Sequence, residues 1–476
     1  MALPSGDIFF ASISELSAKL RAKEFSAVEL TRAFCDRLER IGAAHHALAH
    51  SLRDTAIKKA KDVDGDLKRG RTRGPLQGIP YGAKDLLAVK DQPTEWGSRA
   101  FAGQKFKEDA FVITKLDGAG AILIGKLAMI ELAGGVGYAS AAASSTGAAM
   151  NPWDRSRWAG GSSSGSGVAV AAGLAGFALG SETSGSILTP AAYCGVTGLR
   201  PTYGLVSRRG AMSLAWTMDK IGPMCRSAED CGLVLHVIAG ADEEDPGSAR
   251  KRFAYVPQFD RQVSDFTIGY APVDFERAAP GTQAAFRAAL EVVKGLGVKP
   301  KEVALPDFPY DAVVETVIGA EAAAVFEDLI RGPKLDMMAD RGQAAALRAA
   351  LEIPAVDYLK AMRIRSLIRD ALRNMLYHDV DMLLTPSRME GAPPIGNLDS
   401  GDERPAAGKR GLGDLIPAAN LAGLPAISLP CGLAGGLPVG ISLVGRAFFE
   451  NHLIGVGRAF QARTDWHKRK PPVTES

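Results

Sequence analysis

The chain has 476 residues, enough for one large domain or for two to three ordinary ones. Its hydrophobic share of 46% and its charged share of 23% are those of an average soluble globular protein. A formal charge of +3 is too small a bias to predict nucleic acid or a membrane surface as a partner. We therefore expect a globular protein that binds neither nucleic acid nor a membrane.

Targeting and metal-binding signals are weak in this sequence. No basic segment followed by an apolar one opens the chain, and the apolar stretch 168–179 is too short to span a bilayer. The five cysteines are scattered, and no nearby histidine completes a zinc set beside Cys225 and Cys231. The basic run 467–470 is typical of a solvated terminus. We expect a cytoplasmic protein with free thiols, no metal and no cofactor.

Apolar periodicity predicts helices that alternate with strands. Between Ile13 and Ile41 apolar residues recur at three- and four-residue steps, and Ser26 can cap a second helix. A charged segment at 53–73 predicts an exposed helix and loop. Further strands are expected at 79–81, 121–124, 266–270, 382–384 and 426–429, the last two as a pair, and further helices at 312–330 and 356–377. This alternation predicts a layered α/β architecture without internal repeats.

The segment 134–186 is dominated by glycine, alanine and serine. Its run 158–167 resembles a flexible linker when it is taken alone. The run is followed, however, by a segment of small apolar residues and then by a second small-residue turn at 180–186. A flexible linker would not lead into such a buried segment and a second tight turn. Successive N–H groups in such turns can converge on one anion. We therefore predict an oxyanion hole formed by the N–H groups of Thr183, Ser184, Gly185 and Ser186.

Two other motifs compete for this part of the chain. Residues 161–165 fit the G-x-S-x-G elbow of an α/β-hydrolase, but that motif needs a preceding strand and 151–157 is loop-like. Residues 120–126 nearly fit a P-loop, but Leu127 stands where a magnesium-binding hydroxyl is needed. The elbow is therefore disfavoured and the P-loop is discarded. An amidase that uses two serines and a lysine explains more of the chain.

Three motifs, in order and with matched spacing, resemble those of the amidase signature family. Residues 76–85 resemble its lysine motif, 160–163 its glycine-serine motif and 180–187 its nucleophile motif. Ser162 and Ser186 lie 24 positions apart, as in the family. The likeness continues at 194–204, 219–223, 383–386, 420–428 and 436–440, and it is weak between 241 and 380. It therefore covers nearly the whole chain.

The resemblance implies an α/β fold in which one large mixed sheet is sandwiched between helices. It implies a single domain over 1–476, made of an N-terminal helical segment (1–70), a catalytic core (76–235) and a more variable helical region (241–380). It also implies an enzyme that hydrolyses a linear amide through an acyl-enzyme. Ser186 is the expected nucleophile, Ser162 the proton relay and Lys84 the base, with a cis peptide before Ser162.

Elementary chemistry agrees with these roles. A serine hydroxyl needs a base within hydrogen-bond reach, and none of the seven histidines lies in a promising motif. Lys84 can serve only when it is neutral, so burial and nearby N–H dipoles must lower its pKa by ~3 units from ~10.4. The competing interpretation is a surface lysine paired with Asp85. The apolar setting, framed by glycine and proline, favours the catalytic role.

The nucleophile motif departs from the family pattern Asp-x-Gly-Gly-Ser-Ile-Arg at three positions. Glu182 replaces the aspartate, Ser184 the first glycine and Leu188 the arginine. The loss of the arginine removes a charge near the nucleophile. We therefore expect a neutral amide with an apolar or aryl group, without a carboxylate near the scissile bond. Ser184 can narrow the oxyanion hole and so reduce the rate.

By analogy with the family, four residues are expected to contact the substrate: Gly135, Tyr138, Trp216 and Met218. Core packing is the competing interpretation for the larger side chains. The expected partners are a small-molecule amide and water, and the oligomeric state stays open, a homodimer included.

Two alternatives to a free-standing amidase belong to other functional classes. The first is the A-type subunit of a tRNA-dependent amidotransferase, which shares these motifs and needs glutamine and companion subunits. The second is a non-enzymatic scaffold that kept the fold, against which the intact Lys84, Ser162 and Ser186 argue.

Overall fold

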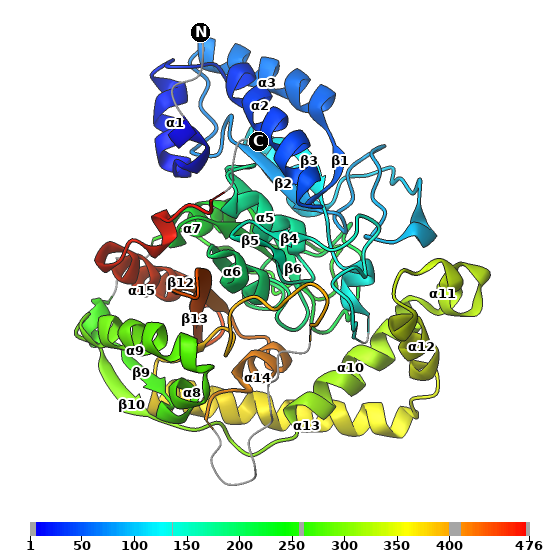
Figure 1. The fold of residues 1–476 in the computed structure, drawn as a ribbon, viewed down its shortest axis with the longest axis vertical. Helices are drawn as coiled ribbons and strands as arrows, with labels where there is room; N and C mark the ends of the chain where they lie inside the picture. The colour runs from blue at the N-terminus through cyan, green and yellow to red at the C-terminus, as the bar shows by residue number, and fades with distance from the viewer. Residues whose placement is uncertain (1–5, 136, 257–260, 399–410, 473–476) are drawn as a thin grey trace.

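A computed structural model describes residues 6–135, 137–256, 261–398 and 411–472. Its centre is one mixed sheet of 11 strands with helices packed around it (Figure 1). In spatial order the strands are β1 (Leu48–Ser51), β3 (Ile122–Leu127), β2 (Pro80–Lys84), β6 (Phe177–Glu182), β8 (Lys220–Cys225), β7 (Thr197–Arg200), β12 (Ala426–Ala434), β13 (Leu437–Gly445), β11 (Met382–Pro386), β9 (Thr267–Tyr270) and β10 (Lys299–Glu302). A separate hairpin joins β4 (Met150–Asn151) to β5 (Asp154–Trp158). The expected fold, one large mixed sheet between helices, is therefore confirmed.

The pairing of the strands differs from the prediction at one place. Strand β2 runs parallel to both β3 and β6, and β9 runs parallel to β10 and β11. The two strands expected to pair, β11 and β12, do not neighbour each other, because β13 lies between them and pairs antiparallel with both. Strand β13 follows β12 after a two-residue turn at Gly435 and Gly436, which have φ of +57° and +83°. The prediction did not include this last strand.

Fifteen α-helices lie in the described residues. They are α1 (Ile13–Arg21), α2 (Ala27–Arg37), α3 (Arg53–Lys68), α4 (Phe111–Gly118), α5 (Ser164–Ala171), α6 (Leu188–Cys194), α7 (Ala228–Ile238), α8 (Pro272–Arg277), α9 (Pro280–Lys294), α10 (Tyr310–Val325), α11 (Glu327–Arg331), α12 (Arg341–Ala350), α13 (Ala355–Asn374), α14 (Leu415–Leu421) and α15 (Glu450–Arg463). Ser26 caps α2 in a capping box with Glu29, as its position predicts. The single helix expected at 312–330 is instead divided at Phe326 into α10 and α11.

The Gly/Ser-rich segment is part of the core. Helices α5 and α6 are buried along their whole length, and so is β6 between them. A side chain at Gly165 would place its Cβ 2.4 Å from the carbonyl oxygen of Ala47 and 2.5 Å from the amide nitrogen of Ala128. Only glycine allows α5 to approach these backbones so closely. The small residues of this segment therefore serve close packing, not the flexibility of a linker.

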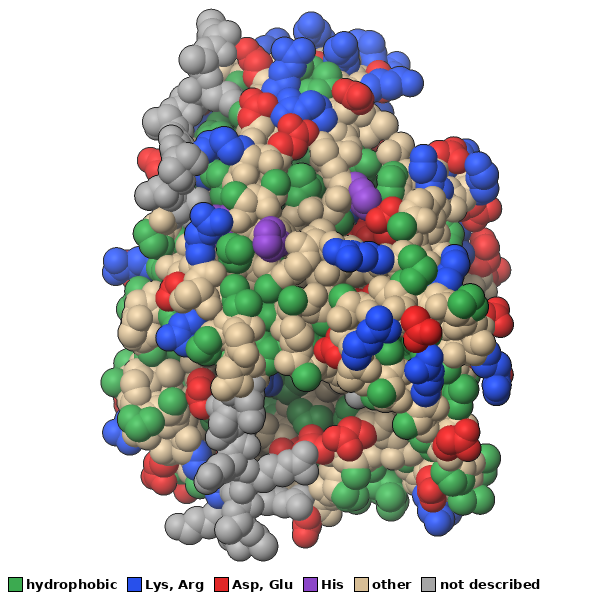
Figure 2. Space-filling view, turned by 45° about the vertical axis from the view of Figure 1, so that its right-hand side comes forward, with side chains coloured by type: hydrophobic (Ala, Val, Ile, Leu, Met, Phe, Trp, Pro, Cys, Tyr) green, Lys and Arg blue, Asp and Glu red, His purple; other side chains and the backbone are tan. Residues whose placement is uncertain are grey.

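The surface mixes charges of both signs. Lys, Arg, Asp and Glu side chains are interspersed over most of the face in Figure 2. The five cysteines are all free and buried. In the described ranges, no helix has the length and the apolar character that a bilayer crossing requires.

Candidate active site

The three predicted motifs meet at one edge of the sheet. Lys84 is the last residue of β2, Ser162 lies in the turn before α5, and Ser186 lies in the turn between β6 and α6. Because β2 and β6 are parallel neighbours, their carboxyl ends open at the same edge, where sites of α/β sheets usually form. The Nζ of Lys84 lies 2.7 Å from the Oγ of Ser162. The structure thus brings the predicted base and the predicted relay into direct contact.

Lys84 has the environment that a neutral base requires. Its side chain is fully buried, and this burial lowers its pKa to about 7 although Asp219 and Glu182 act in the opposite direction. A second hydrogen bond joins Lys84 Nζ to the Oγ of Ser181 at 2.9 Å. At neutral pH a large fraction of the lysine is therefore unprotonated and can accept a proton.

Asp85 does not pair with Lys84, as the interpretation of Lys84 as a surface lysine would require. Its Oδ1 accepts a hydrogen bond from the Nζ of Lys126 at 3.0 Å, and both side chains are buried. Its Oδ2 accepts from the N–H of Glu95 at 3.0 Å. In the described residues, the ion-pair partner of Asp85 is thus the lysine of β3, and Lys84 turns toward the serines.

The turn that carries Ser162 is tightly packed against its neighbours. The peptide between Gly161 and Ser162 is cis. A Cβ at Gly161 would lie 2.7 Å from Ile130 Cγ1, 2.9 Å from Trp158 Cζ2 and 2.9 Å from the hydroxyl of Tyr138. The carbonyl of Ser162 accepts the N–H of Ile130 at 3.1 Å. This packing holds Ser162 beside Lys84 in one position.

Glu182 holds the turn of the predicted nucleophile Ser186, called here the nucleophile turn, from its buried side. The carboxylate Oε2 accepts the N–H groups of Ile187 at 2.9 Å and Leu188 at 3.0 Å, directly after Ser186. Gly185 has φ +90°, a conformation that strains any side chain. Ser186 itself is partly exposed. The turn therefore presents Ser186 outward while its neighbours are fixed inward.

Glu182 is itself bound by two residues from distant parts of the chain. Its Oε1 accepts from Arg200 Nη1 at 2.7 Å and from Asn420 Nδ2 at 2.9 Å, and the Glu182 and Arg200 side chains are fully buried. Burial alone would raise the pKa of Glu182, but the charges of Arg200 and Lys220 outweigh it and lower the pKa to about 2. The residue that replaces the family aspartate is therefore an ionised anchor of the nucleophile turn.

A cavity of about 300 Å³ opens beside this turn. Thr183, Ser184 and Ser186 line it, together with apolar, aromatic and small residues, among them Ala133, Gly134, Gly135, Gly137, Tyr138, Trp158, Gly161, Tyr193, Leu214, Val314, Ile318, Pro393 and Leu398. Among its described lining residues, the charged ones are Glu315 and Arg388. Such a largely apolar cavity with a few convergent polar groups is typical of a small-molecule site.

The expected substrate-binding residues divide into two pairs. Gly135 and Tyr138 line the cavity, and residue 136 between them lies outside the described residues. Trp216 is 40% exposed and Met218 is fully buried in the main core, and neither is among the described residues that line the cavity. Of the predicted oxyanion donors, Gly185 is buried and is likewise not among those residues.

Three residues whose side chains hydrogen-bond to Lys84 or Glu182 were not predicted. Ser181 contacts Lys84, and Arg200 and Asn420 bind Glu182. Ser181 lies inside the nucleophile motif, so its position was a signal that could have been used. Arg200 and Asn420 lie in segments noted only for their family likeness, and periodicity alone could not link them to residue 182. In the described residues, no three histidine, cysteine or carboxylate side chains gather as metal ligands would.

Comparisons with known proteins agree with this geometry. The profile of the Amidase family matches residues 29–454. The A-type subunit of glutamyl-tRNA(Gln) amidotransferase from Dechloromonas aromatica is 37% identical, over 97% of this chain and 99% of the relative. A Mycobacterium tuberculosis protein named as an amidase, AmiD, is 36% identical, over 97% and 96%. The crystal structure of the peptide amidase from Stenotrophomonas maltophilia matches with a TM-score of 0.85 and 30% identity, over 98% and 99% of the two chains.

These matches cover nearly the full length of each relative, so they bear on the whole fold and not on a fragment of it. The chain belongs to the amidase signature family and is an enzyme that acts on amide C–N bonds, as a hydrolase or as an amidotransferase component.

Proposed function

We propose that this protein is an amidohydrolase that cleaves a carboxylic amide through an acyl-enzyme on Ser186. The observation that carries the proposal is the 2.7 Å contact between Lys84 Nζ and Ser162 Oγ, next to the cavity that Ser186 lines. A buried lysine with a pKa of about 7 can accept a proton from a serine at neutral pH. Burial of the base, a neighbouring serine relay and an accessible nucleophile together support acyl transfer.

In the proposed cycle the Oγ of Ser186 attacks the amide carbonyl. Its proton passes to Ser162, and the proton of Ser162 passes to Lys84. The N–H groups of the turn 183–186 stabilise the negative charge on the carbonyl oxygen. When the C–N bond breaks, the proton returns through Ser162 to the leaving amine. Water then repeats the same steps on the acyl-enzyme and releases the carboxylic acid and free Ser186.

We propose a substrate that is neutral around its scissile amide, with an apolar or aryl group in the cavity. Leu188 stands where the family pattern has arginine; it is fully buried, and it is not among the described residues that line the cavity. Apolar and aromatic side chains form much of the cavity wall. The kcat/KM of a neutral aryl amide should exceed that of a malonamate-like anion. A preference for the anion would overturn this substrate class and would point to Arg388 as its binding residue.

Covalent labelling tests the catalytic proposal directly. A fluorophosphonate should label the native protein and not Ser186→Ala. Ser162→Ala should label slowly, because the nucleophile then lacks its relay to Lys84. A screen of amides, esters, ureas and carbamates defines the bond that is cleaved. Labelling of Ser186→Ala at the native rate would contradict the proposal.

The second candidate is the glutamine amidase subunit of a tRNA-dependent amidotransferase. The comparison of whole sequences favours it, since A-type subunits of glutamyl-tRNA(Gln) amidotransferases from several bacteria are 35–38% identical over nearly the full chain. Glutamine carries an ammonium and a carboxylate, and the cavity holds Glu315 and Arg388 as complementary charges. Amide hydrolysis by the isolated chain supports the first candidate. Glutaminase activity that needs co-purifying subunits supports the second.

A further inference from the structure

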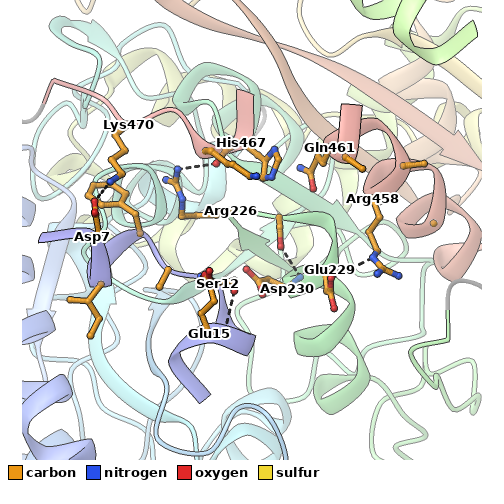
Figure 3. Close-up of a pocket in the computed structure, with 18 of the residues that line it drawn as sticks. Asp7, Ser12, Glu15, Arg226, Glu229, Asp230, Arg458, Gln461, His467 and Lys470 are labelled. Atoms are coloured by element: carbon orange, nitrogen blue, oxygen red, sulfur yellow. Dashed lines mark hydrogen bonds and ion pairs between the residues drawn. The ribbon is translucent and has the colours of Figure 1, made fainter. Parts of the chain in front are cut away.

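A second, larger cavity of about 1080 Å³ lies where the two ends of the chain come together. Its walls come from the N-terminal segment with the start of α1, the N-terminus of α7, residues 261–263, α15 and the segment 467–470 (Figure 3). It shares no described lining residue with the catalytic cavity. Nothing in the proposed amide chemistry uses it.

Arg226 is a buried charged residue in the wall of this cavity. It is only 8% exposed and lies just before Ser227, the N-cap of α7. Its Nη2 donates to the carbonyl oxygens of His467 at 2.8 Å and Arg469 at 3.0 Å. Burial lowers the pKa of Arg226 to about 10, so the guanidinium still carries its charge at neutral pH.

Two nitrogens of this guanidinium remain for a ligand in the cavity that Arg226 lines. Its Nε and Nη1 have no hydrogen-bond partner in the described part of the chain, and neither is sealed off from solvent. No described carboxylate approaches Arg226 within the 4.0 Å of an ion pair. Asp230 lines the same cavity without pairing with it (Figure 3). A buried cation without a counter-ion is unfavourable, and a ligand anion would supply that counter-ion.

The acidic groups of the cavity are already bound elsewhere. Asp7 pairs with Lys470, and Glu229 pairs with Arg458 at 3.5 Å. Glu15 accepts the N–H of Ser12 at 2.7 Å in the capping box of α1. Asp230 accepts the N–H of Ile13 at 3.1 Å and lies in the first turn of α7, where the helix dipole favours a negative charge.

We propose that this cavity binds a small anionic molecule, whose carboxylate, sulfate or phosphate group accepts a hydrogen bond from the Nε or the Nη1 of Arg226. Hydrogen bonds from a guanidinium to such oxyanions are charge-assisted and stronger than those between neutral groups. Lys468, exposed and lining the same cavity, adds a second positive charge. The carbonyls of His467 and Arg469 hold the Nη2 of the guanidinium, so Arg226 is oriented before the ligand arrives.

Asp230 gives this site a dependence on pH. Burial raises the pKa of Asp230 to about 7, so its charge increases between pH 6 and pH 8 and repels a bound anion. Burial lowers the pKa of His467 to about 4, so this ring stays neutral over that range. The other charged residues that line the cavity with Asp230 are Asp7, Glu15, Lys19, Arg226, Glu229, Arg261, Arg458, Lys468 and Lys470. Anion binding should therefore weaken as the pH rises from 6 to 8.

Titration calorimetry on the full chain at constant ionic strength tests the proposal. Sulfate and succinate are the probes, because neither changes charge appreciably between pH 6.5 and pH 8. We expect saturable binding of at least one probe, and the tighter one tells whether the natural ligand carries a tetrahedral oxyanion or a carboxylate. Arg226→Gln should weaken binding roughly tenfold or more, the worth of one charge-assisted hydrogen bond.

Matched variants separate this site from general effects. Arg261 also lines the cavity, but its guanidinium is engaged with Asp381 at 2.7 Å, so Arg261→Gln should leave the affinity nearly unchanged. Asp230→Asn should keep binding and remove its pH dependence. Arg226→Lys retains the charge without the guanidinium donors and is used if Arg226→Gln does not fold. The absence of saturable binding, or equal affinity in a folded Arg226 variant, would overturn the proposal without touching the amidase chemistry.

Discussion

The Nζ of Lys84 lies 2.7 Å from the Oγ of Ser162, although the two residues are 78 positions apart in the chain. The first ends β2 and the second precedes α5, and the parallel pairing of β2 with β6 brings both to the edge where the nucleophile turn begins. This contact gives the buried amine a serine partner directly after Gly161, which lines the cavity of Ser186. Substitution of Lys84 or Ser162, or of the groups around them, should change the rate or the stability of the protein.

The pH dependence of the rate reports the protonation of Lys84. The lysine must be neutral to accept a proton, and burial lowers its pKa to about 7. The value of kcat/KM for a neutral amide should therefore rise with pH and reach half its plateau near pH 7. Lys84→Met should lower the plateau by about 10²–10⁴-fold, the usual worth of a positioned general base. A Lys84→Met enzyme with the native profile would contradict the role of this lysine.

Ser181 is the second side chain that holds Lys84. Its Oγ accepts from Nζ at 2.9 Å and so stabilises the ammonium form of the lysine. Ser181→Ala should lower kcat roughly threefold to tenfold, since one hydrogen bond of ordinary strength is lost. It should also move the midpoint of the pH profile to lower pH.

Ser166→Ala is the matched control for this variant. Ser166 is also buried, and its Oγ donates to the carbonyl of Leu179 at 2.9 Å instead of contacting Lys84. This variant should keep the native midpoint. A shared shift in both variants would show that the effect arises from packing rather than from the lysine contact.

Glu182 stabilises the fold through its charge. Glu182→Gln leaves the buried guanidinium of Arg200 without its counter-ion, which should cost about 3–5 kcal/mol in the free energy of unfolding. The pKa of Glu182 is lowered from 4.5 to about 2, so its contribution is complete above pH 4.5 and is lost as the pH falls toward 2. Urea unfolding at pH 7 and at pH 3 should therefore show a larger penalty at pH 7.

Glu315→Gln is the control for this prediction, because Glu315 is exposed at the rim of the cavity. Its free energy of unfolding should change by no more than about 0.5 kcal/mol. If Glu182→Gln changes the free energy of unfolding by an equally small amount, then hydrogen bonds hold the nucleophile turn and the charge of Glu182 is not needed.

The space around position 161 has no room for a residue larger than glycine. A Cβ there would meet Ile130, Trp158 and Tyr138 at 2.7–2.9 Å, and Gly161 precedes Ser162. Gly161→Ala should destabilise the protein by about 1–3 kcal/mol, as overpacking does, and should lower kcat by displacing Ser162. Thermal unfolding and steady-state kinetics measure the two effects.

The control is Gly281→Ala in α9, where a Cβ would find no neighbour within 4 Å. This change should be neutral or stabilising by about 0.4–1 kcal/mol through the unfolded chain. Full activity and native stability in Gly161→Ala would show that the turn before α5 can shift without loss.

Local chemistry accounts for what could be predicted from the sequence. Capping residues, apolar runs and small-residue turns act over a few positions, and this is why the sequence predicts helices between 13 and 41, strands at 79–81 and 266–270, and the buried Gly/Ser segment. The order and spacing of the motifs that contain Lys84, Ser162 and Ser186 carried the family assignment, and the family profile confirms it. Their catalytic roles stay a proposal.

Only the tertiary structure decided which distant residues meet. Sheet order places β13 between β11 and β12, and pairing of β2 with β6 carries Ser181 to Lys84. Arg200 and Asn420 reach Glu182 across 18 and 238 positions, and the second cavity joins both ends of the chain. The sequence by itself determined the chemistry available at each turn, because turns are local. The long-range packing decided which charges are buried together, because burial and pairing depend on neighbours that periodicity does not encode.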